Sequence, residues 1–409
     1  MTDVDVVYNP FEPGFTADPY PHYDELREHQ PVCQTPIGFW LLFRYDDAFR
    51  FLRDPKLSVE ERHATPGPLD TVMEDILGDR ADRFSSAMLN RDAPDHTRLR
   101  RLVSKAFTPQ AIERLRPRIQ TWVDEALDRV EPDGEMDLIA DLAFPLPFTV
   151  ISEMLGMPEV DRAKLREWSG LLVRTLEPLF DTDLMRAIAD AGDSMSDLLM
   201  GIIEDKRRHP ADDLLSALIA AEDEGDVLSD DELLSQLMLL YIAGHETTVN
   251  LIGNGTLALL RNPAELDRWH HDPTLDRNAV EELLRYDPPV QMSRRIVRED
   301  VEVGGHTIEA GSFVAVVLAS ANRDRAHWGE TADQLDLTRG NAHDHLSFGG
   351  GAHHCLGAAL ARLEAQIALG TLIRRFPGIE LAGEPEWNGR INLRGLDRLP
   401  LSLGKRQSD

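Results

Sequence analysis

Two cysteines among 409 residues are too few for a disulfide framework, and Cys33 and Cys355 lie far apart in the sequence. No CxxC pair is present, so nothing in the sequence indicates a structural zinc site. The chain also lacks a run of about twenty apolar residues that would span a bilayer, and its N-terminus lacks a basic and apolar leader. We therefore expect a cytoplasmic protein without a membrane anchor.

Basic residues are in the minority. Lys and Arg total 43 against 72 Asp and Glu, which gives a formal charge of -29. That charge repels polyanions, so nucleic acid or an anionic membrane surface is not expected as the main partner. A hydrophobic content of 42% allows a large core. Because no repeat or low-complexity linker divides the chain, we expect a single domain over residues 1–409.

Helical periodicity dominates the sequence, and strand patterns are short. The predicted helices lie near residues 110–131, 184–208, 230–261, 276–286 and 356–375. The predicted strands lie at Phe39–Phe43, Val301–Ile308, Phe313–Val317 and near the C-terminus. This pattern indicates a mainly α fold with minor β structure.

The longest predicted helix carries polar residues at its centre. Ser229 and Glu232 form a capping-box start and Asn262 precedes a proline stop, which bounds a helix of roughly 48 Å. Its middle, LMLLYIAGHETTVNLIG, is nearly apolar all round and should be buried. Gly244 leaves a notch, and Thr247 can bond the carbonyl one turn back. On this segment alone, a packing glycine with a helix-satisfied threonine is as good an interpretation as a functional pair.

A glycine-rich loop runs into the last predicted helix and places Cys355 at its N-terminal end. The free backbone N–H groups and the helix dipole favour a thiolate there. We expect the glycines at 349–351 to remove side chains where the backbone passes close to a large flat group. Phe348 is expected to shield the sulfur from water. For an arbitrary cysteine, a buried structural role would be the preferred interpretation.

The run Phe348-Gly-x-Gly351-x-His353-x-Cys355-x-Gly357 resembles the heme-binding loop of the cytochrome P450 family, and the chain is similar to that family over nearly its full length. The resemblance implies heme b (iron protoporphyrin IX), held between the long central helix and the helix after Cys355, whose thiolate ligates the iron. It also implies cofactor contacts at these loop residues: Phe348, Gly349, His353, Cys355 and Gly357.

The central helix also resembles the family at Ala243-Gly244-His245-Glu246-Thr247-Thr248. The resemblance implies that Ala243 and Gly244 lie against the heme. It further implies that Glu246 and Thr247 are catalytic, as an acid and alcohol pair that helps to deliver protons during oxygen activation.

Two charged groups match the family as well. Glu282 and Arg285 form an ExxR pair, which in the family is buried and joined by a downstream arginine, here Arg339. Its implied role is structural. Before Arg339 many relatives carry Pro-x-x-Phe, whereas this chain has Ala332-Asp-Gln-Leu335.

Cationic donors for the heme propionates form the second group. His96 and Arg100 face the same way from one helix, and the resemblance adds Arg295 and His353.

The resemblance implies a monooxygenase that inserts one oxygen atom from O2 into a lipophilic small molecule, by hydroxylation or epoxidation. Electrons would come from NAD(P)H through a ferredoxin reductase and a ferredoxin. Arg98, Arg101 and Lys105 form a basic helix face that would steer this acidic partner. The loops near 62–90, 168–190, 289–294 and 391–397 would line the substrate pocket, with Leu240, Ala243, Val290 and Leu393 as wall candidates.

Three alternatives remain open. A zinc hydrolase would use His245 with Cys355 or His354, although Val249 stands where the HExxH signature needs its second histidine. A heme-thiolate sensor or carrier would have no need of Glu246 and Thr247. A peroxide-driven oxidase or dehydratase would typically lack that pair too.

Overall fold

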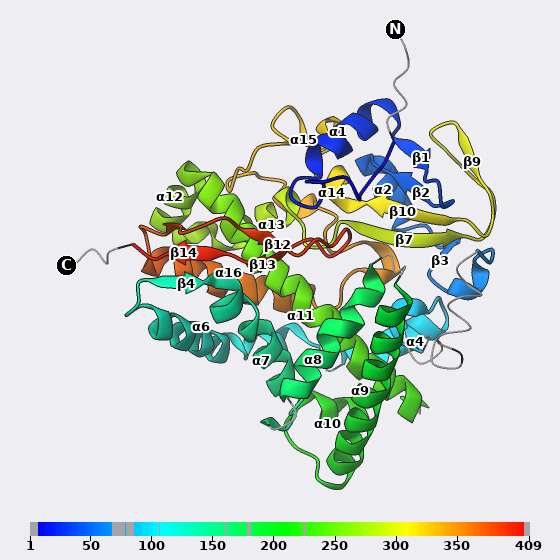
Figure 1. Ribbon diagram of the computed structural model, residues 1–409. Helices are drawn as coiled ribbons and strands as arrows, with labels where there is room; N and C mark the ends of the chain where they lie inside the picture. The colour runs from blue at the N-terminus through cyan, green and yellow to red at the C-terminus, as the bar shows by residue number, and fades with distance from the viewer. Residues whose placement is uncertain are drawn as a thin grey trace.

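The computed structural model describes residues 7–67, 78, 86–105, 107–159, 162–177, 181–223 and 226–404, most of them in helices (Figure 1). The α-helices are α1 Tyr20–His29, α2 Tyr45–Phe51, α4 Asp95–Ser104, α5 Pro109–Glu113, α6 Arg116–Val130, α7 Pro145–Met154, α8 Arg162–Leu172, α9 Thr182–Arg208, α10 Leu214–Ile219, α11 Asp230–Arg261, α12 Pro263–His271, α13 Asp276–Tyr286, α14 Leu318–Ala321, α15 Arg325–Trp328 and α16 Ala358–Arg375. None of these described helices combines the length and the apolar character needed to cross a bilayer.

The strands are short and fall into small sheets. They are β1 Val32–Gln34, β2 Trp40–Leu42, β3 Leu57–Ser58, β4 Glu135–Asp137, β5 Glu222–Asp223, β6 Asp226–Val227, β7 Met292–Val297, β8 Val301–Val303, β9 His306–Ile308, β10 Phe313–Val317, β11 Glu380–Leu381, β12 Glu386–Trp387, β13 Leu396–Arg398 and β14 Pro400–Ser402. The largest sheet has the order β1-β2-β10-β7-β3, in which β2 and β10 are parallel and the other pairs antiparallel. The predicted class, mainly α with minor β, is confirmed.

Helix α11 crosses the centre of the molecule (Figure 1). The Ser229 side chain accepts from the Glu232 backbone N–H, and the Glu232 side chain accepts from the Ser229 N–H, so the predicted capping box is present. The helix runs for 32 residues and ends at Arg261, directly before Asn262 and Pro263. Both predicted ends are therefore confirmed.

Two hydrophobic clusters share α11. Its N-terminal half, with Leu237 and Tyr241, packs in a cluster with α4, α7, α8 and α9. Its C-terminal half, with Ile252 and Leu257, packs in a cluster with α6, α13 and α16. The segment between them, residues 243–247, therefore lies where the two clusters meet.

One predicted helix is divided in two. The sequence pattern predicted a continuous helix over residues 110–131, but α5 ends at Glu113 and α6 begins at Arg116. Pro117 occupies the first turn of α6. Because proline lacks a backbone N–H and clashes with the preceding turn, it is tolerated at a helix start but interrupts a continuous helix.

Candidate functional site

The loop before α16 is folded tightly around Cys355. The Cys355 backbone N–H donates to the Phe348 carbonyl at 2.9 Å, and the Gly349 N–H donates to the Leu346 carbonyl at 2.8 Å. Gly349 and Gly351 have φ angles of 70° and 66°, which disfavour any residue with a side chain. Cys355 lies two residues before Gly357, the N-cap of α16, as the sequence predicted.

Two glycines of this loop also pack closely against neighbouring atoms of the protein. A Cβ at Gly351 would lie 2.6 Å from the carbonyl oxygen of Leu52, and a Cβ at Gly350 would lie 2.8 Å from Nη1 of Arg53. The sequence interpretation gave these glycines the sole task of approaching a flat group. At 351, the positive φ angle and the close approach to the Leu52 carbonyl at the end of α2 already require glycine, whereas at 350 the neighbour is the movable end of the Arg53 side chain.

The thiol of Cys355 is enclosed, although the residue is accessible. Burial raises the pKa of the Cys355 thiol, whereas the N–H groups of Gly357 and Ala358 and the charges of Arg100 and Arg362 lower it. Burial outweighs these groups, so the helix terminus alone does not produce the thiolate that the sequence led us to expect. The residue as a whole nevertheless remains exposed, so Cys355 borders open space.

The middle of α11 lines an open space as well. Ala243 and Gly244 are exposed although their neighbours Ile242 and His245 are buried. A Cβ added at Gly244 would meet no atom within 4 Å. The Thr247 hydroxyl donates to the Ala243 carbonyl at 2.8 Å, which confirms the predicted bond to the preceding turn.

Glu246 is held by an arginine that sequence reasoning missed. Arg390 donates through Nη1 to Oε1 of Glu246 at 2.5 Å, and their side chains are 15% and 13% exposed. Burial raises the pKa of Glu246; Arg390 and Arg174 oppose this rise, and Asp397 adds to it. Because 144 residues separate the partners, no local sequence pattern could have revealed the pair.

The four predicted propionate donors come together in the structure. The rings of His96, on α4, and His353, in the cysteine loop, have centroids 4.2 Å apart. Arg100 donates to the His354 carbonyl at 2.7 Å. Burial, with repulsion from His96 and Arg295, lowers the pKa of His353 to about 3.

Arg295 is the most buried arginine of this group, at 6% exposed. It donates to the Ser293 hydroxyl and to the Arg294 carbonyl, at 3.1 and 2.8 Å, and forms no ion pair with any residue in the described ranges. Burial lowers its pKa to about 10, while Asp92 opposes that shift. A bound anion would supply the opposite charge for Arg295 and Arg100, with His96 and His353 as hydrogen-bonding neighbours.

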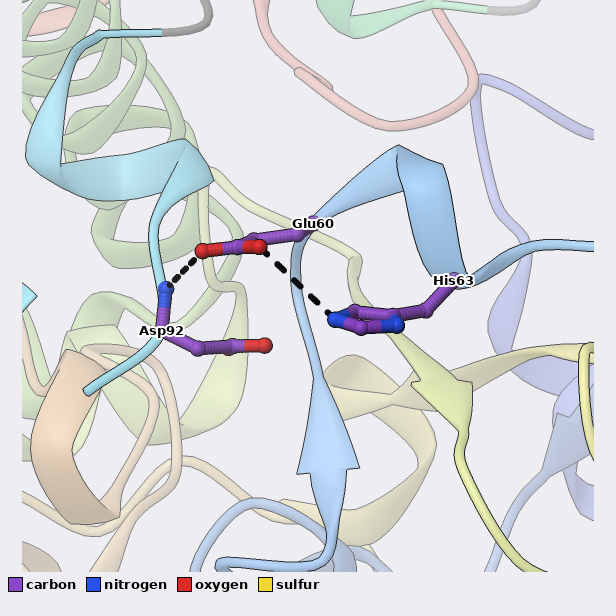
Figure 2. A group of neighbouring side chains, drawn as sticks. All are labelled: Glu60, His63 and Asp92. Atoms are coloured by element: carbon purple, nitrogen blue, oxygen red, sulfur yellow. Dashed lines mark hydrogen bonds and ion pairs between the residues drawn. The ribbon is translucent and has the colours of Figure 1, made fainter. Parts of the chain in front are cut away.

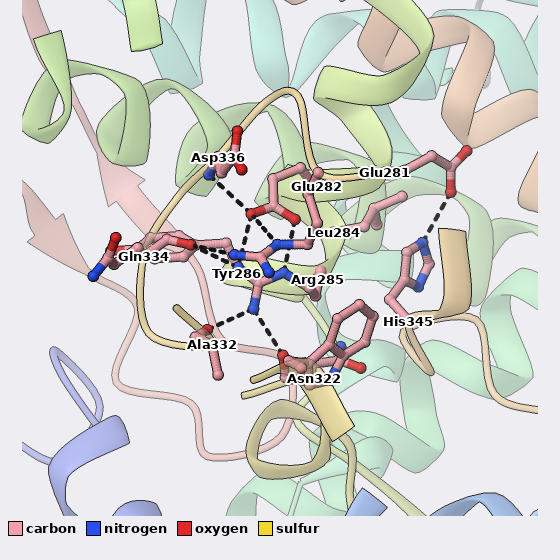
Figure 3. Close-up of polar contacts among 12 residues, drawn as sticks. Glu281, Glu282, Leu284, Arg285, Tyr286, Asn322, Ala332, Gln334, Asp336 and His345 are labelled. Atoms are coloured by element: carbon pink, nitrogen blue, oxygen red, sulfur yellow. Dashed lines mark hydrogen bonds and ion pairs between the residues drawn. The ribbon is translucent and has the colours of Figure 1, made fainter. Parts of the chain in front are cut away.

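The ExxR pair is fully buried, as the resemblance implied, and Figure 3 shows its polar contacts. Arg285 donates to both carboxylate oxygens of Glu282 at 2.7 Å and to the carbonyls of Asn322, Ala332 and Gln334. Arg339 Nε donates to the same carboxylate at 3.2 Å. The segment Ala332–Leu335, which departs from the family pattern, therefore still supplies acceptors to Arg285, because the acceptors are backbone carbonyls and do not depend on the side chains.

Glu60, His63 and Asp92 form the one group of described residues spaced closely enough to hold a metal ion (Figure 2). Glu60 Oε1 accepts from the Asp92 N–H at 2.9 Å, while Oε2 lies 3.7 Å from His63 and pairs with Arg62. Both Asp92 oxygens accept from residues 58–59. Glu60 Oε2 is buried and accepts no hydrogen bond from the described residues, although it is ion-paired with Arg62. The hydrogen bonds to Glu60 Oε1 and to both Asp92 oxygens tie β3 to the segment before α4.

The zinc alternative is not supported by the geometry. His245 Nε2 lies 3.1 Å from the Phe144 carbonyl, and the ring stands edge-on to Phe144 and Phe148. Neither His245 nor Cys355 belongs to the described group that could hold a metal. The residues that a zinc hydrolase would need are thus not brought together.

The predicted basic face needs one correction. Arg98 pairs with Glu232 and Asp226, so its charge is neutralised within the chain. Arg101 and Lys105 are exposed on and beside α4. Arg53, which the sequence did not single out, is exposed and lies over the Phe49 ring at 3.5 Å, in a pocket of about 190 Å³ that includes His354 and Arg362 of the cysteine loop region.

Three of the predicted substrate-wall residues share a cluster. Leu240 and Val290 pack against the cluster that contains Leu393, and Val290 pairs with Leu393 in an isolated β-bridge. Leu356, next to the cysteine, packs against the same cluster. The predicted lining at 68–77, 79–85 and 178–180 lies outside the described residues.

These features fit heme b. An accessible cysteine would supply an iron ligand, four cationic or polar donors would suit two propionates, and Gly244 leaves open space on α11. The apolar cluster that reaches both α11 and Leu356 suits the body of a porphyrin.

Comparisons with known proteins agree with this interpretation. A family model described as Cytochrome P450 matches residues 72–386. The chain is 43% identical over 408 residues to cytochrome P450 107B1 of Saccharopolyspora erythraea, covering 96% of this chain and 97% of that protein. It is 43% identical to the vitamin D(3) 25-hydroxylase of Pseudonocardia autotrophica, covering 97% of each. The crystal structure of P450BioI with hexadec-9Z-enoic acid ligated acyl carrier protein superposes with a TM-score of 0.88, at 36% identity, over 95% of this chain and 98% of that one.

Proposed function

This chain belongs to the cytochrome P450 family and is a heme-dependent monooxygenase, and from that premise we propose that it hydroxylates or epoxidises a lipophilic small molecule with electrons from a ferredoxin. The observation that carries the proposal is that the cysteine loop packs against both hydrophobic clusters, through Phe348 and Leu356, as α11 does on either side of residues 243–247. The proposal treats residues 1–409 as one domain. It places the enzyme in the cytoplasm, where reducing conditions keep Cys355 a thiol.

The proposed heme contacts follow the cationic donors and the cysteine loop. Cys355 would ligate the iron, and His96, Arg100, Arg295 and His353 would hold the propionates. The remaining contacts would come from Ala243, Gly244, Phe348, Gly349 and Gly357. When bound, a thiolate-ligated heme supplies the activation of O2, a reaction that no protein side chain performs alone.

The chain's own residues would manage protons. The Thr247 hydroxyl donates its hydrogen bond to the Ala243 carbonyl, one turn back on α11. Ala243 and the adjacent Gly244 are both exposed. Burial keeps the pKa of Glu246 above its ordinary value, which brings the carboxyl closer to exchanging a proton near neutral pH. We assign Glu246 as the proton source and Thr247 as the residue that presents the proton to the reaction.

The substrate class is lipophilic because the proposed wall is apolar. Leu240, Val290 and Leu393 supply it. The names of the relatives are in keeping with this class: one is a vitamin D(3) hydroxylase, and another binds a fatty-acyl carrier protein.

Docking of the ferredoxin is proposed at the pocket that Arg53 shares with His354, with the exposed Arg101 and Lys105 as further cations on and beside α4. These exposed cations stand out against the formal charge of -29 on the whole chain. Complementary charge would steer an acidic partner to this face and would make the association sensitive to salt.

The test starts with the purified, heme-loaded enzyme. A strongly red-shifted Soret band after reduction and carbon monoxide binding would establish thiolate ligation. Lipophilic compounds that perturb the heme spectrum would then be incubated with NADPH, ferredoxin and ferredoxin reductase under ¹⁸O2. One labelled oxygen in the product supports the proposal. Turnover with peroxide but not with O2 contradicts it, and binding without any turnover indicates a sensor or carrier.

A further inference from the structure

The loop between β12 and β13 carries Arg390, the partner of Glu246, and a second carboxylate holds this loop in place. Glu177 accepts hydrogen bonds from three consecutive backbone N–H groups, those of Ile391, Asn392 and Leu393. The shortest contacts are 2.8, 3.0 and 2.6 Å, respectively. Successive N–H groups that converge in this way form an anion-binding nest, here occupied by a side chain.

Glu177 comes from a different part of the chain. It directly follows the 3₁₀ turn Val173–Leu176 at the end of α8, 214 residues from Ile391. The Asn392 side chain also donates to the Leu176 carbonyl at 3.2 Å. The segment at the end of α8 is thus hydrogen-bonded to the loop immediately after Arg390.

The other side of the loop is anchored on α11. Asn250 Nδ2 donates to the Leu393 carbonyl at 3.3 Å, and Asn254 Nδ2 donates to the Arg394 carbonyl at 3.0 Å. These bonds lie after residue 392, so α11 fixes the far end of the loop. Among the described contacts, Glu177 is the charged group that fixes the end next to Arg390.

We propose that Glu177 is a positioning residue for the proton-delivery acid: by binding the backbone at 391–393, it holds Arg390 against Glu246. This inference rests on the proposed function, which gives Glu246 its role. It couples the end of α8 to the reacting centre, so that any displacement of this segment loosens the Glu246–Arg390 ion pair. The charged groups that face Glu246 are Arg390, Arg174 and Asp397.

The sign of one effect separates positioning from direct electrostatics. Glu177 is an anion, so if it acted on Glu246 through space, its removal would lower the pKa of Glu246. If it acts through Arg390, its removal withdraws a cation from Glu246 and raises that pKa. A purely structural role would lower thermal stability and leave the titration of Glu246 where it is.

The experiment is an infrared pH titration of the heme-loaded enzyme and its Glu177→Gln variant. The carboxyl band of Glu246 is identified by its loss in Glu246→Gln. We expect Glu177→Gln to shift this titration to higher pH, in the same direction as Arg390→Gln. Glu265→Gln is the matched control, since Glu265 on α12 also accepts a backbone N–H, from Leu337 at 2.9 Å, and should leave the titration unchanged.

A double variant completes the test. If Glu177 works through Arg390, adding Glu177→Gln to Arg390→Gln produces no further upward shift, because the shared contact is already lost. A downward or absent shift in Glu177→Gln, or an upward shift fully additive with that of Arg390→Gln, would overturn the inference. Should Glu177→Gln not fold, Glu177→Asp keeps the charge, withdraws it by one methylene, and is expected to give a smaller upward shift.

Peroxide release separates this inference from the proposed function. In the reconstituted system, Glu246→Gln should divert electrons to hydrogen peroxide if Glu246 delivers protons. Unchanged peroxide release in Glu246→Gln would refute the role of Glu246 even if the infrared titration shifts. An unshifted titration in Glu177→Gln, together with peroxide release in Glu246→Gln, would refute only the role of Glu177.

Discussion

Arg285 and Glu282 form a two-pronged ion pair in which both N···O distances are 2.7 Å and both side chains are 0% exposed. Arg339 shares the same carboxylate. With five donors committed to Glu282 and to backbone carbonyls, Arg285 fastens α13 to the segment before the cysteine loop. Removal of Glu282 leaves Arg285 and Arg339 buried without a carboxylate, and removal of Arg285 leaves Glu282 with Arg339 as its one arginine partner among the described ion pairs.

Glu282→Gln should therefore lower the free energy of unfolding by about 3–5 kcal/mol and reduce heme content on expression. Arg285→Lys should lower stability and heme content in the same way, since an ammonium cannot reproduce the planar, two-pronged contact. The measurements are thermal unfolding and heme-to-protein ratio. Arg186→Gln, which breaks an exposed pair with Asp183, is the control and should change stability by no more than about 0.5 kcal/mol. An equal loss in the control would contradict the assignment.

Cys355→Ser should retain the fold but lose the red-shifted carbon monoxide band. A serine hydroxyl has no thiolate character, so the iron would keep a weak ligand or none. The optical spectrum of the reduced protein with carbon monoxide checks this. Cys33→Ser is the matched control, because Cys33 is the other cysteine of the chain and lies in β1, outside the proposed site. Loss of the band in both variants would count against Cys355 as the ligand.

The parts of the fold that sequence reasoning located have local causes. The capping box at Ser229 and the Asn262-Pro263 stop are adjacent to the helix they bound, so both ends of α11 were predicted. Pro117 was an equally local signal for the start of α6, and it was overlooked.

The contacts that were missed join distant segments. Arg390 and Glu246, and Glu177 and Ile391, meet only after the chain has folded, and neither pair has a spacing that could be recognised. The neutralisation of Arg98 by Asp226 and Glu232 is hidden in the sequence for the same reason. The propionate donors were grouped by resemblance, and the structure brings them together; their role stays a prediction.

Arg295→Gln should weaken heme retention. The variant keeps hydrogen-bonding capacity but loses a buried cation aimed at the proposed propionates, a charge-assisted bond worth about 1.5–3 kcal/mol. Heme transfer to an excess of apomyoglobin should accelerate by about tenfold or more. Arg298→Gln, just beyond β7 and exposed, should transfer heme at the wild-type rate. Equal rates in all three proteins would exclude Arg295 from heme binding.

Thr247→Ala should uncouple electron use from product formation. The variant lacks the hydroxyl that donates to the Ala243 carbonyl and that is proposed to present protons to the reaction. We therefore expect the electrons consumed to appear as hydrogen peroxide in place of product. The ratio of peroxide to NADPH consumed should rise severalfold while heme loading is unchanged. Thr248→Ala removes a similar bond, to the Gly244 carbonyl at 3.3 Å, from a buried position and should stay coupled. Normal coupling in Thr247→Ala would remove Thr247 from proton delivery.

His245 should make the protein sensitive to acid. Burial lowers its pKa to about 4, and the nearby Arg166 and Arg390 contribute to this shift, whereas the Phe144 carbonyl opposes it. An ordinary histidine has a pKa of about 6.5. Between pH 6.5 and 4, the unfolded chain therefore binds a proton at His245, whereas the folded chain does not. Stability from His245 is therefore complete above pH 6.5 and is lost as the pH falls towards 4, by on the order of 3 kcal/mol.

His245→Gln tests this prediction, because its side-chain amide can still donate to the Phe144 carbonyl but does not titrate. We expect the variant to be less stable than the wild type at pH 7 and to lose less stability between pH 6.5 and 4. Denaturant unfolding of the heme-loaded proteins across this range measures the difference, in which contributions from other groups cancel. His209→Gln, at an exposed position after α9, is the control and should follow the wild-type curve. A His245→Gln curve parallel to the wild type would mean that His245 has the same pKa in the folded and the unfolded protein, which would contradict the prediction.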